Sequence, residues 1–219
     1  EIEYISLSYN IIYTQKENPM KRILLAVAAV LLVSLACSAL TQVTGPDGSG
    51  PAPTILFQDD FSDPQSGWPV TAETDQTVEY ANGQYRILAS KPSFDVWATI
   101  NQQFEGDVRV EVDATKAGGP NDNDFGVVCH YKDDSNFYYF LLSSDGYQVI
   151  GMYLNGESKF LSSEKMQASD VIKQDSVTNH IRADCIGDTL TLYVNGQQVV
   201  STTDTSLTDG TVGVIAGTF

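Results

Sequence analysis

Aromatic side chains are the residues of this 219-residue sequence best suited to bind a small molecule. In the segment NFYYF, Phe137 and Tyr139 lie on one face of an expected strand, and Tyr138 and Phe140 lie on the other. Flat aromatic rings stack on the apolar C–H faces of sugars, and a few polar groups bind the hydroxyls. One of the two faces must pack in the core, so core packing is the structural alternative. The predicted ligand-binding set is Trp97, Arg109, His130, Tyr131, Tyr138, Tyr139, Tyr153 and Arg182.

Carboxylates suited to catalysis are harder to find. A glycoside hydrolase needs two carboxyl groups about 5 to 10 Å apart across its substrate. Glu111 and Asp113 share one face of an expected strand, but no third acid follows them, and the aromatic segment contains no carboxylate. We interpret both acids as exposed strand charges. The sequence therefore favours a binding protein without catalytic residues, with a glycoside hydrolase as the alternative.

Two acidic clusters are candidates for calcium. The first contains Asp59, Asp60 and Asp63, and the second contains Asp122 and Asp124. Neither has the spacing of an EF-hand loop, and a hard cation needs six or more oxygen ligands. We interpret these aspartates as solvated turn residues and expect no cofactor, with a structural calcium ion as the alternative. The two histidines of the chain are isolated in sequence and form no zinc pattern.

Two of the three cysteines fit the interior of a β-sandwich. Cys129 shares an expected strand face with Phe125 and Val127, and Cys185 likewise alternates with apolar neighbours. Because both faces look inward, we predict a disulfide between them, which would close a loop of about 55 residues. Two buried free thiols are the alternative.

The third cysteine follows a segment with the features of an export signal. Two basic residues precede an apolar run at 23–35, which is shorter than the roughly 20 residues that span a bilayer. Ser34-Leu35-Ala36-Cys37 resembles a bacterial lipobox, and this resemblance implies lipidation of Cys37. Segment 37–54 is rich in Gly and Pro and therefore predicts a flexible tether.

The predicted organisation has four parts. Residues 1–19 precede the first methionine of the export signal, and we interpret them as a translated upstream extension. The other three parts are a lipoprotein signal peptide at 20–36, the tether at 37–54 and a folded domain at 55–219.

The residue pattern of the folded domain predicts an all-β antiparallel sandwich. Residues 108–114, VRVEVDA, alternate strictly between apolar and charged side chains, and few segments have the helical period. Short strands without interleaved helices are typical of a β-sandwich or jelly roll. Hairpin turns are expected at Asn82-Gly83, Asp145-Gly146, Asn155-Gly156, Asn195-Gly196 and Asp209-Gly210.

Several segments of this domain resemble the concanavalin A-like lectin/glucanase superfamily. They are LFQDDFSDPQSGWPV, YANGQYRI, DNDFGVVCHYKDDSNFYYFLLSSDGYQVIGMYLNG, DTLTLYVNGQQVVSTT and GTVGVIAGTF. They are similar in particular to laminin G-like jelly-roll domains on bacterial lipoproteins. This resemblance implies a concanavalin A-like jelly roll with a further strand after the last of these segments, so we expect the sequence to lack its last strand.

Charge limits the class of partner. The chain has 28 acidic and 12 basic residues, a formal net charge of −16, which argues against nucleic acid. An anionic domain is also repelled by anionic headgroups, so membrane attachment would depend on acyl chains. We expect an extracytoplasmic, membrane-anchored lipoprotein that binds a glycan or another envelope or extracellular ligand. A structural or adhesion module with protein partners is a further alternative.

Overall fold

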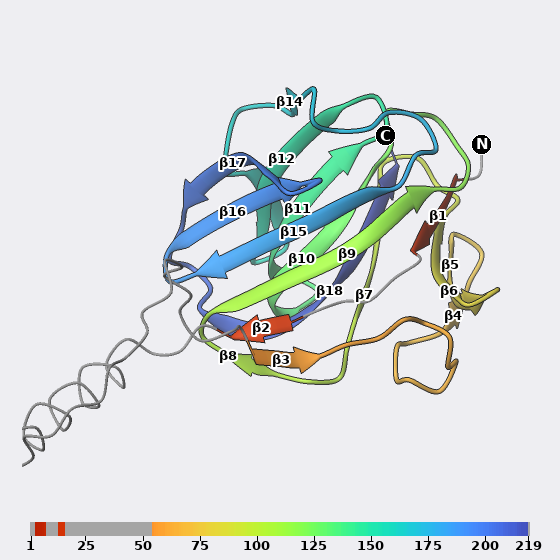
Figure 1. Cartoon of the computed structure of the whole chain (residues 1–219), viewed down its shortest axis with the longest axis horizontal. Helices are drawn as coiled ribbons and strands as arrows, with labels where there is room; N and C mark the ends of the chain where they lie inside the picture. Colours follow the sequence, from red (N-terminus) through yellow and green to blue (C-terminus); the bar gives the residue numbers. More distant parts are fainter. Residues whose placement is uncertain (1–2, 8–12, 16–53, 219) are drawn as a thin grey trace, which may run out of the picture.

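The computed structural model describes residues 3–7, 13–15 and 54–218, and within them all regular secondary structure is β-strand (Figure 1). The predicted antiparallel β-sandwich is confirmed. In chain order the strands are β1 (Glu3–Leu7), β2 (Tyr13–Gln15), β3 (Thr54–Phe57), β4 (Thr71–Ala72), β5 (Gln76–Ala81), β6 (Gln84–Ala89), β7 (Phe94–Thr99), β8 (Phe104–Glu105), β9 (Val108–Lys116), β10 (Asp124–Asp133), β11 (Asn136–Ser143), β12 (Tyr147–Leu154), β13 (Glu157–Phe160), β14 (Gln167–Ala168), β15 (Asn179–Ile186), β16 (Thr189–Val194), β17 (Gln197–Thr203) and β18 (Asp209–Thr218).

Two antiparallel sheets form the layers of the sandwich. Sheet A has the order β17-β16-β15-β9-β1-β6-β5-β4, with β2 beside β9 and β3 beside β2. Sheet B has the order β13-β12-β11-β10-β18-β7, with β14 beside β12 and β8 beside β18. In Figure 1, β9, β15 and β16 of sheet A lie in front of β10, β11 and β18 of sheet B.

Alternating side chains produce the interface between the sheets. The valines of β9 point inward and are fully buried, while the charged residues between them are partly exposed. From sheet B, Tyr138 and Phe140 enter the same core. The Cys129–Cys185 disulfide is confirmed, and it links β10 of sheet B to β15 of sheet A.

The asparagine–glycine turns form as expected. Asn82, Asn155 and Asn195 have φ values of 56°, 55° and 51°, and each precedes a glycine that also has positive φ. The expected turn at Asp209-Gly210 is wrong, because both residues lie in β18 and pair with β8.

The segments β1 and β2 come from the part that sequence analysis assigned to an upstream extension. In the structure β1 pairs with β6 on one side and β9 on the other, and β2 pairs with β3 and β9. Residues 16–53 lie outside the described residues, so the signal peptide, Cys37 lipidation and the tether stay predictions. No helix in the described part has the length and apolar character needed to cross a membrane.

Candidate functional site

The face of sheet B that points away from the core carries a cluster of aromatic rings. Because Tyr138 and Phe140 of β11 enter the core, their neighbours Phe137 and Tyr139 project from the opposite face. Three partly buried rings from other strands join them, and all five are named the aromatic face: Trp97, Tyr131, Phe137, Tyr139 and Tyr153.

Phe137 is the centre of the aromatic face. Its ring centroid lies 5.1 Å from that of Trp97, 5.5 Å from that of Tyr131 and 4.9 Å from that of Tyr153, on which it stacks. Phe137 is fully buried by these contacts, whereas Trp97, Tyr131 and Tyr153 keep part of their surface in solvent. The exposed surface of this face is therefore formed by one tryptophan and two tyrosines.

Rings from distant strands meet on this face, and glycines lie between and beside them. Trp97 of β7 and Phe137 of β11 are separated by β18 and β10, so about 14 Å of sheet lies between their backbones. The intervening strands carry Gly126 and Gly213 on this face, where a Cβ atom would clash with the backbone of a neighbouring strand. On β12, a Cβ atom at Gly151 would lie 2.3 Å from the Tyr139 ring, so that ring lies flat on the glycine backbone.

Carboxylates bind the polar ends of the aromatic face. Asp134 Oδ1 accepts hydrogen bonds from Trp97 Nε1 at 3.1 Å and from the Tyr131 hydroxyl at 2.5 Å. Burial raises the pKa of Tyr131 to about 12, and the hydrogen bond to Asp134 adds to the increase. The Tyr153 hydroxyl donates to Asp95 Oδ2 at 2.8 Å. These bonds fix the ring orientations and leave carboxylate oxygens as acceptors.

A second carboxylate lies next to Asp95. A Cβ atom at Gly217 would lie 2.4 Å from Asp95 Oδ1 and 2.6 Å from Asp124 Oδ1, so the two oxygens are separated by no more than the sum of these distances. Burial raises the pKa of Asp124 to about 8, and the negative charge of Asp95 adds to this. Burial also raises the pKa of Asp95, although the hydrogen bond from Tyr153 opposes the change. Asp124 Oδ1 is buried and has no hydrogen-bond partner among the described residues.

A small pocket opens beside the start of β12. It has a volume of about 250 Å³ and is lined by Asp122, Ser143, Asp145, Tyr147 and Met166. Tyr147 is 41% exposed and is the ring available for stacking there. The Ser143 hydroxyl donates to Asp145 Oδ1.

Two of the predicted ligand-binding residues lie in the interior. Tyr138 is fully buried, and its hydroxyl donates to Asp204 Oδ1 at 2.6 Å. His130 is 2% exposed because a β-bulge, with φ 48° at His130, breaks the alternation of β10. Burial lowers the pKa of His130, against the effect of the Gly106 and Leu207 carbonyls that its ring nitrogens face at 3.1 Å. The prediction that these two residues bind a ligand beside the other rings does not fit this placement.

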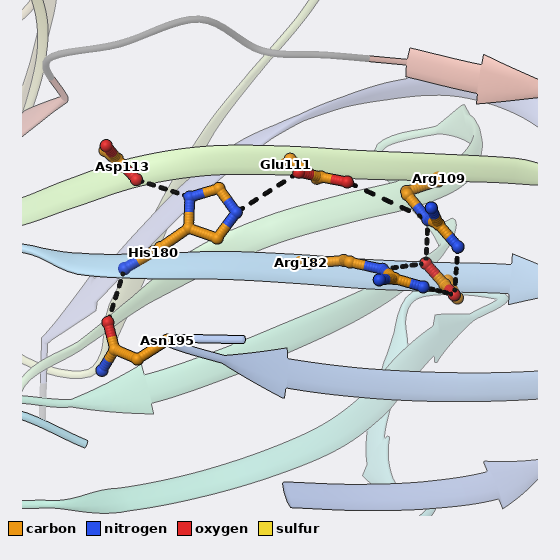
Figure 2. A network of polar contacts seen from close by, with 7 residues as sticks. Arg109, Glu111, Asp113, His180, Arg182 and Asn195 are labelled. Atoms are coloured by element: carbon orange, nitrogen blue, oxygen red, sulfur yellow. Dashed lines mark hydrogen bonds and ion pairs between the residues drawn. The ribbon is translucent and has the colours of Figure 1, made fainter. Parts of the chain in front are cut away.

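The two predicted arginines lie on the other sheet, as Figure 2 shows. Arg109 of β9 and Arg182 of β15 both bind Asp184, with Nε–Oδ1 distances of 2.7 and 2.8 Å. Burial alone would raise the pKa of Asp184, but the hydrogen bonds from Arg182 and Arg109 outweigh it and lower the pKa. Arg182 also stacks over Tyr193, 4.2 Å from the ring centroid. Strand alternation places these arginines on the face of sheet A that points away from the core between the sheets. They therefore cannot contact a ligand at the aromatic face of sheet B.

The same network contains the two acids considered for catalysis. His180 Nδ1 lies 2.6 Å from Asp113 Oδ1, and its Nε2 lies 3.3 Å from Glu111 Oε2 (Figure 2). The hydrogen bond to Glu111 raises the pKa of His180, burial opposes it, and Asp113 adds to the increase. This ladder of charges pairs β9 with β15 and offers no free acid–base pair.

The acidic clusters singled out for calcium have local roles. Asp59, Asp60 and Asp63 each accept a backbone N–H from the residue two positions later, as turn aspartates do. Asp122 lines the small pocket, and Asp124 is buried beside Asp95. Because Asp59 and Asp124 are both buried, the interpretation as solvated turn residues is wrong for these two. Among the described residues, no group of three or more His, Cys, Asp or Glu side chains forms a metal cluster.

Sequence reasoning missed the glycines and the carboxylates of this face. Asp95 and Trp97 are two residues apart on β7 and therefore share a face, as do Gly213, Ile215 and Gly217 on β18. This two-residue spacing could have shown from the sequence which residues share a face. Only the strand order shows that the residues of β7 and those of β18 lie next to one another.

Comparison with known proteins gives structural neighbours only. No protein-family model and no curated protein sequence matches the chain. A carbohydrate-binding module, CBM66 from Bacillus subtilis, aligns with TM-score 0.51 and 16% identity over 68% of this chain and 83% of that one. A Bacillus subtilis protein of unknown function with a galectin-like fold aligns with TM-score 0.53 and 10% identity over 74% of this chain and 89% of that one. The fold is a jelly roll.

The jelly roll agrees with the resemblance to the concanavalin A-like superfamily found in the sequence. At these identities the likeness describes the fold alone, so the laminin G and lipoprotein assignments stay predictions.

Proposed function

We propose that this protein binds glycans through the aromatic face of sheet B and does not cleave them. The observation that carries the proposal is the cluster of Trp97, Tyr131 and Tyr153 around Phe137, with partly exposed rings held by Asp134 and Asp95. Such rings stack on the C–H faces of a sugar, and the carboxylates accept hydrogen bonds from its hydroxyls.

Two further points support a binding role. The rings are fixed by hydrogen bonds before any ligand arrives, which reduces the entropy lost on binding. One of the structural neighbours is itself described as a carbohydrate-binding module. The Asp95–Asp124 pair does not favour hydrolysis, because Asp124 is only 6% exposed.

The setting of this function is the second part of the proposal. The protein acts outside the cytoplasm and is anchored to the cell envelope through lipidated Cys37. The disulfide across the sandwich supports an oxidising compartment. Incorporation of labelled fatty acid into the wild-type chain, and its loss in Cys37→Ala, tests the anchor.

Glycan binding is tested by screening the chain on a glycan array and measuring each hit by calorimetry. Trp97→Ala should weaken binding roughly fivefold to tenfold, since a stacked ring contributes about 1 to 1.5 kcal/mol and 1.4 kcal/mol corresponds to a factor of about ten. Tyr193→Ala is the matched control, because it removes a partly exposed ring from sheet A. No binding to any glycan, or equal losses in the two variants, would contradict the proposal.

A further inference from the structure

The carboxyl groups of Asp95 and Asp124 meet beside Gly217, on the face of sheet B that carries the aromatic rings. In the strand register, Gly217 of β18 pairs with Asp95 of β7 and with Asp124 of β10. A Cβ atom at position 217 would lie 2.4 Å from Asp95 Oδ1 and 2.6 Å from Asp124 Oδ1, so the two oxygens occupy the space that a side chain would need. The glycine therefore allows acids from two separate strands to come together.

This geometry disfavours two negative charges on the pair. Asp124 is 6% exposed, and its Oδ1 atom is buried without a hydrogen-bond partner. The ion pairs found among the described residues involve neither Asp95 nor Asp124. Two acids in one such site do not both ionise at neutral pH, so one keeps a proton. Asp124 keeps it, because the Tyr153 hydroxyl donates to Asp95 Oδ2 at 2.8 Å and stabilises the charged form of Asp95.

Two tyrosines are the titratable neighbours of the pair in the described part of the chain, Tyr139 from β11 and Tyr153 from β12. Burial raises the pKa of Tyr139 to about 12, the hydrogen bond with Ser158 opposes this, and the charges of Asp95 and Asp124 add to the increase. Burial also raises the pKa of Tyr153, and the charge of Asp95 adds to this increase. Both phenols therefore stay neutral while Asp124 loses its proton.

We propose that loss of the proton from the Asp95–Asp124 pair releases Tyr153 and thereby weakens glycan binding at the aromatic face. When Asp124 gives its proton to the solvent, its new charge repels that of Asp95. Asp95 then turns away from Asp124, and the Tyr153 hydroxyl loses its acceptor. The freed ring has more conformations to lose when a sugar stacks on it, which lowers the affinity. This inference rests on the proposed function, because glycan binding is what the proton controls.

Carbon NMR of the full chain with ¹³C-labelled aspartate carboxyl groups detects the proton without any glycan. Burial and the charge of Asp95 raise the pKa of Asp124 to about 8, so one carboxyl resonance should titrate there. Asp124→Asn should remove this resonance, and in Asp95→Asn it should titrate at lower pH because the neighbouring charge is gone. If no aspartate carboxyl titrates between about pH 6 and about pH 10, the proposal is wrong.

Calorimetry at about pH 6.5 and about pH 9.5 measures the effect on glycan binding. The affinity of the wild type should fall about threefold to tenfold at the higher pH, as expected from ordering one freed side chain on binding. Asp124→Asn imitates the protonated acid and should bind equally well at both pH values. Asp60→Asn is the control and should keep the wild-type fall, because Asp60 is an exposed aspartate in another turn.

The outcomes separate this inference from the proposed function. Equal wild-type affinity at both pH values, or the same fall in Asp124→Asn, would overturn the proton control and leave glycan binding intact. Absence of glycan binding at both pH values would contradict the proposed function itself, and with it the control of binding, even where the carboxyl resonance titrates as expected.

Discussion

At the scale of single residues, His180 makes the stability of the fold depend on pH. Its hydrogen bonds to Glu111 and Asp113 raise its folded pKa above the unfolded value of about 6.5. The stabilisation is therefore complete below the unfolded pKa and is lost as pH rises through the raised folded pKa. Because the side chain is 40% exposed, solvent screening keeps the contribution below about 1 kcal/mol.

We predict that His180→Gln lowers the free energy of unfolding near pH 6 and has little effect near pH 9. Urea unfolding of both proteins at the two pH values measures this. An equal loss of unfolding free energy at both pH values would show instead that His180 stabilises the fold through packing.

Gly151 tests the packing of the aromatic face. In Gly151→Ala the new Cβ would lie 2.3 Å from the Tyr139 ring, so the ring must move. We expect a loss of about 1–3 kcal/mol in unfolding free energy, typical of overpacking, together with weaker glycan binding. In a Tyr139→Ala background, Gly151→Ala should lower the unfolding free energy far less. If the losses of unfolding free energy in the two single variants simply add in the double variant, the two residues do not interact.

At the scale of strands, β1 fills a position between β6 and β9. A chain cleaved before Cys37, as we propose, would lack β1 and β2, and the facing edges of β6 and β9 would then lack their pairing with β1. We predict that residues 37–219 alone are less stable than the full chain and more prone to associate, because unpaired edges recruit other strands.

Thermal unfolding and size-exclusion chromatography compare the two chains directly. A synthetic peptide of residues 1–15 should restore part of the lost stability. Equal melting temperatures and a monomeric short chain would show that β1 is dispensable.

The disulfide stabilises the contact between the two sheets. Cys129 and Cys185 are 56 residues apart in sequence. Closing such a loop lowers the conformational entropy of the unfolded chain, which raises the free energy of unfolding by about 4 kcal/mol. The double variant Cys129→Ala/Cys185→Ala should lose about this amount in denaturant unfolding, as should the reduced wild type. A loss below about 1 kcal/mol would mean that strain or residual structure cancels the entropic effect.

At the scale of the whole molecule, the sequence predicts local features better than long-range ones. Alternation along β9 and β11 and the asparagine–glycine turns depend on neighbouring residues, so the sandwich and its turns could be predicted. Whether Arg109 and Arg182 can contact a ligand at the aromatic face depends on which sheet contains their strands. The sheet of each strand is decided by pairing between residues far apart in sequence. The His130 bulge and the Asp95–Asp124 contact likewise require knowledge of which strands lie side by side.

The overall charge adds a final constraint on the ligand. The chain carries a formal charge of −16, and the aromatic face is flanked by the carboxylates of Asp95 and Asp134. Anionic glycans are therefore repelled, both on approach and at the site. We predict that the sulfated form of any glycan that binds has at least tenfold lower affinity at low salt. Raising the ionic strength should narrow this difference, because salt screens exposed charges beyond about 8–10 Å. A difference that persists unchanged in high salt would instead indicate steric exclusion of the sulfate groups by the rings.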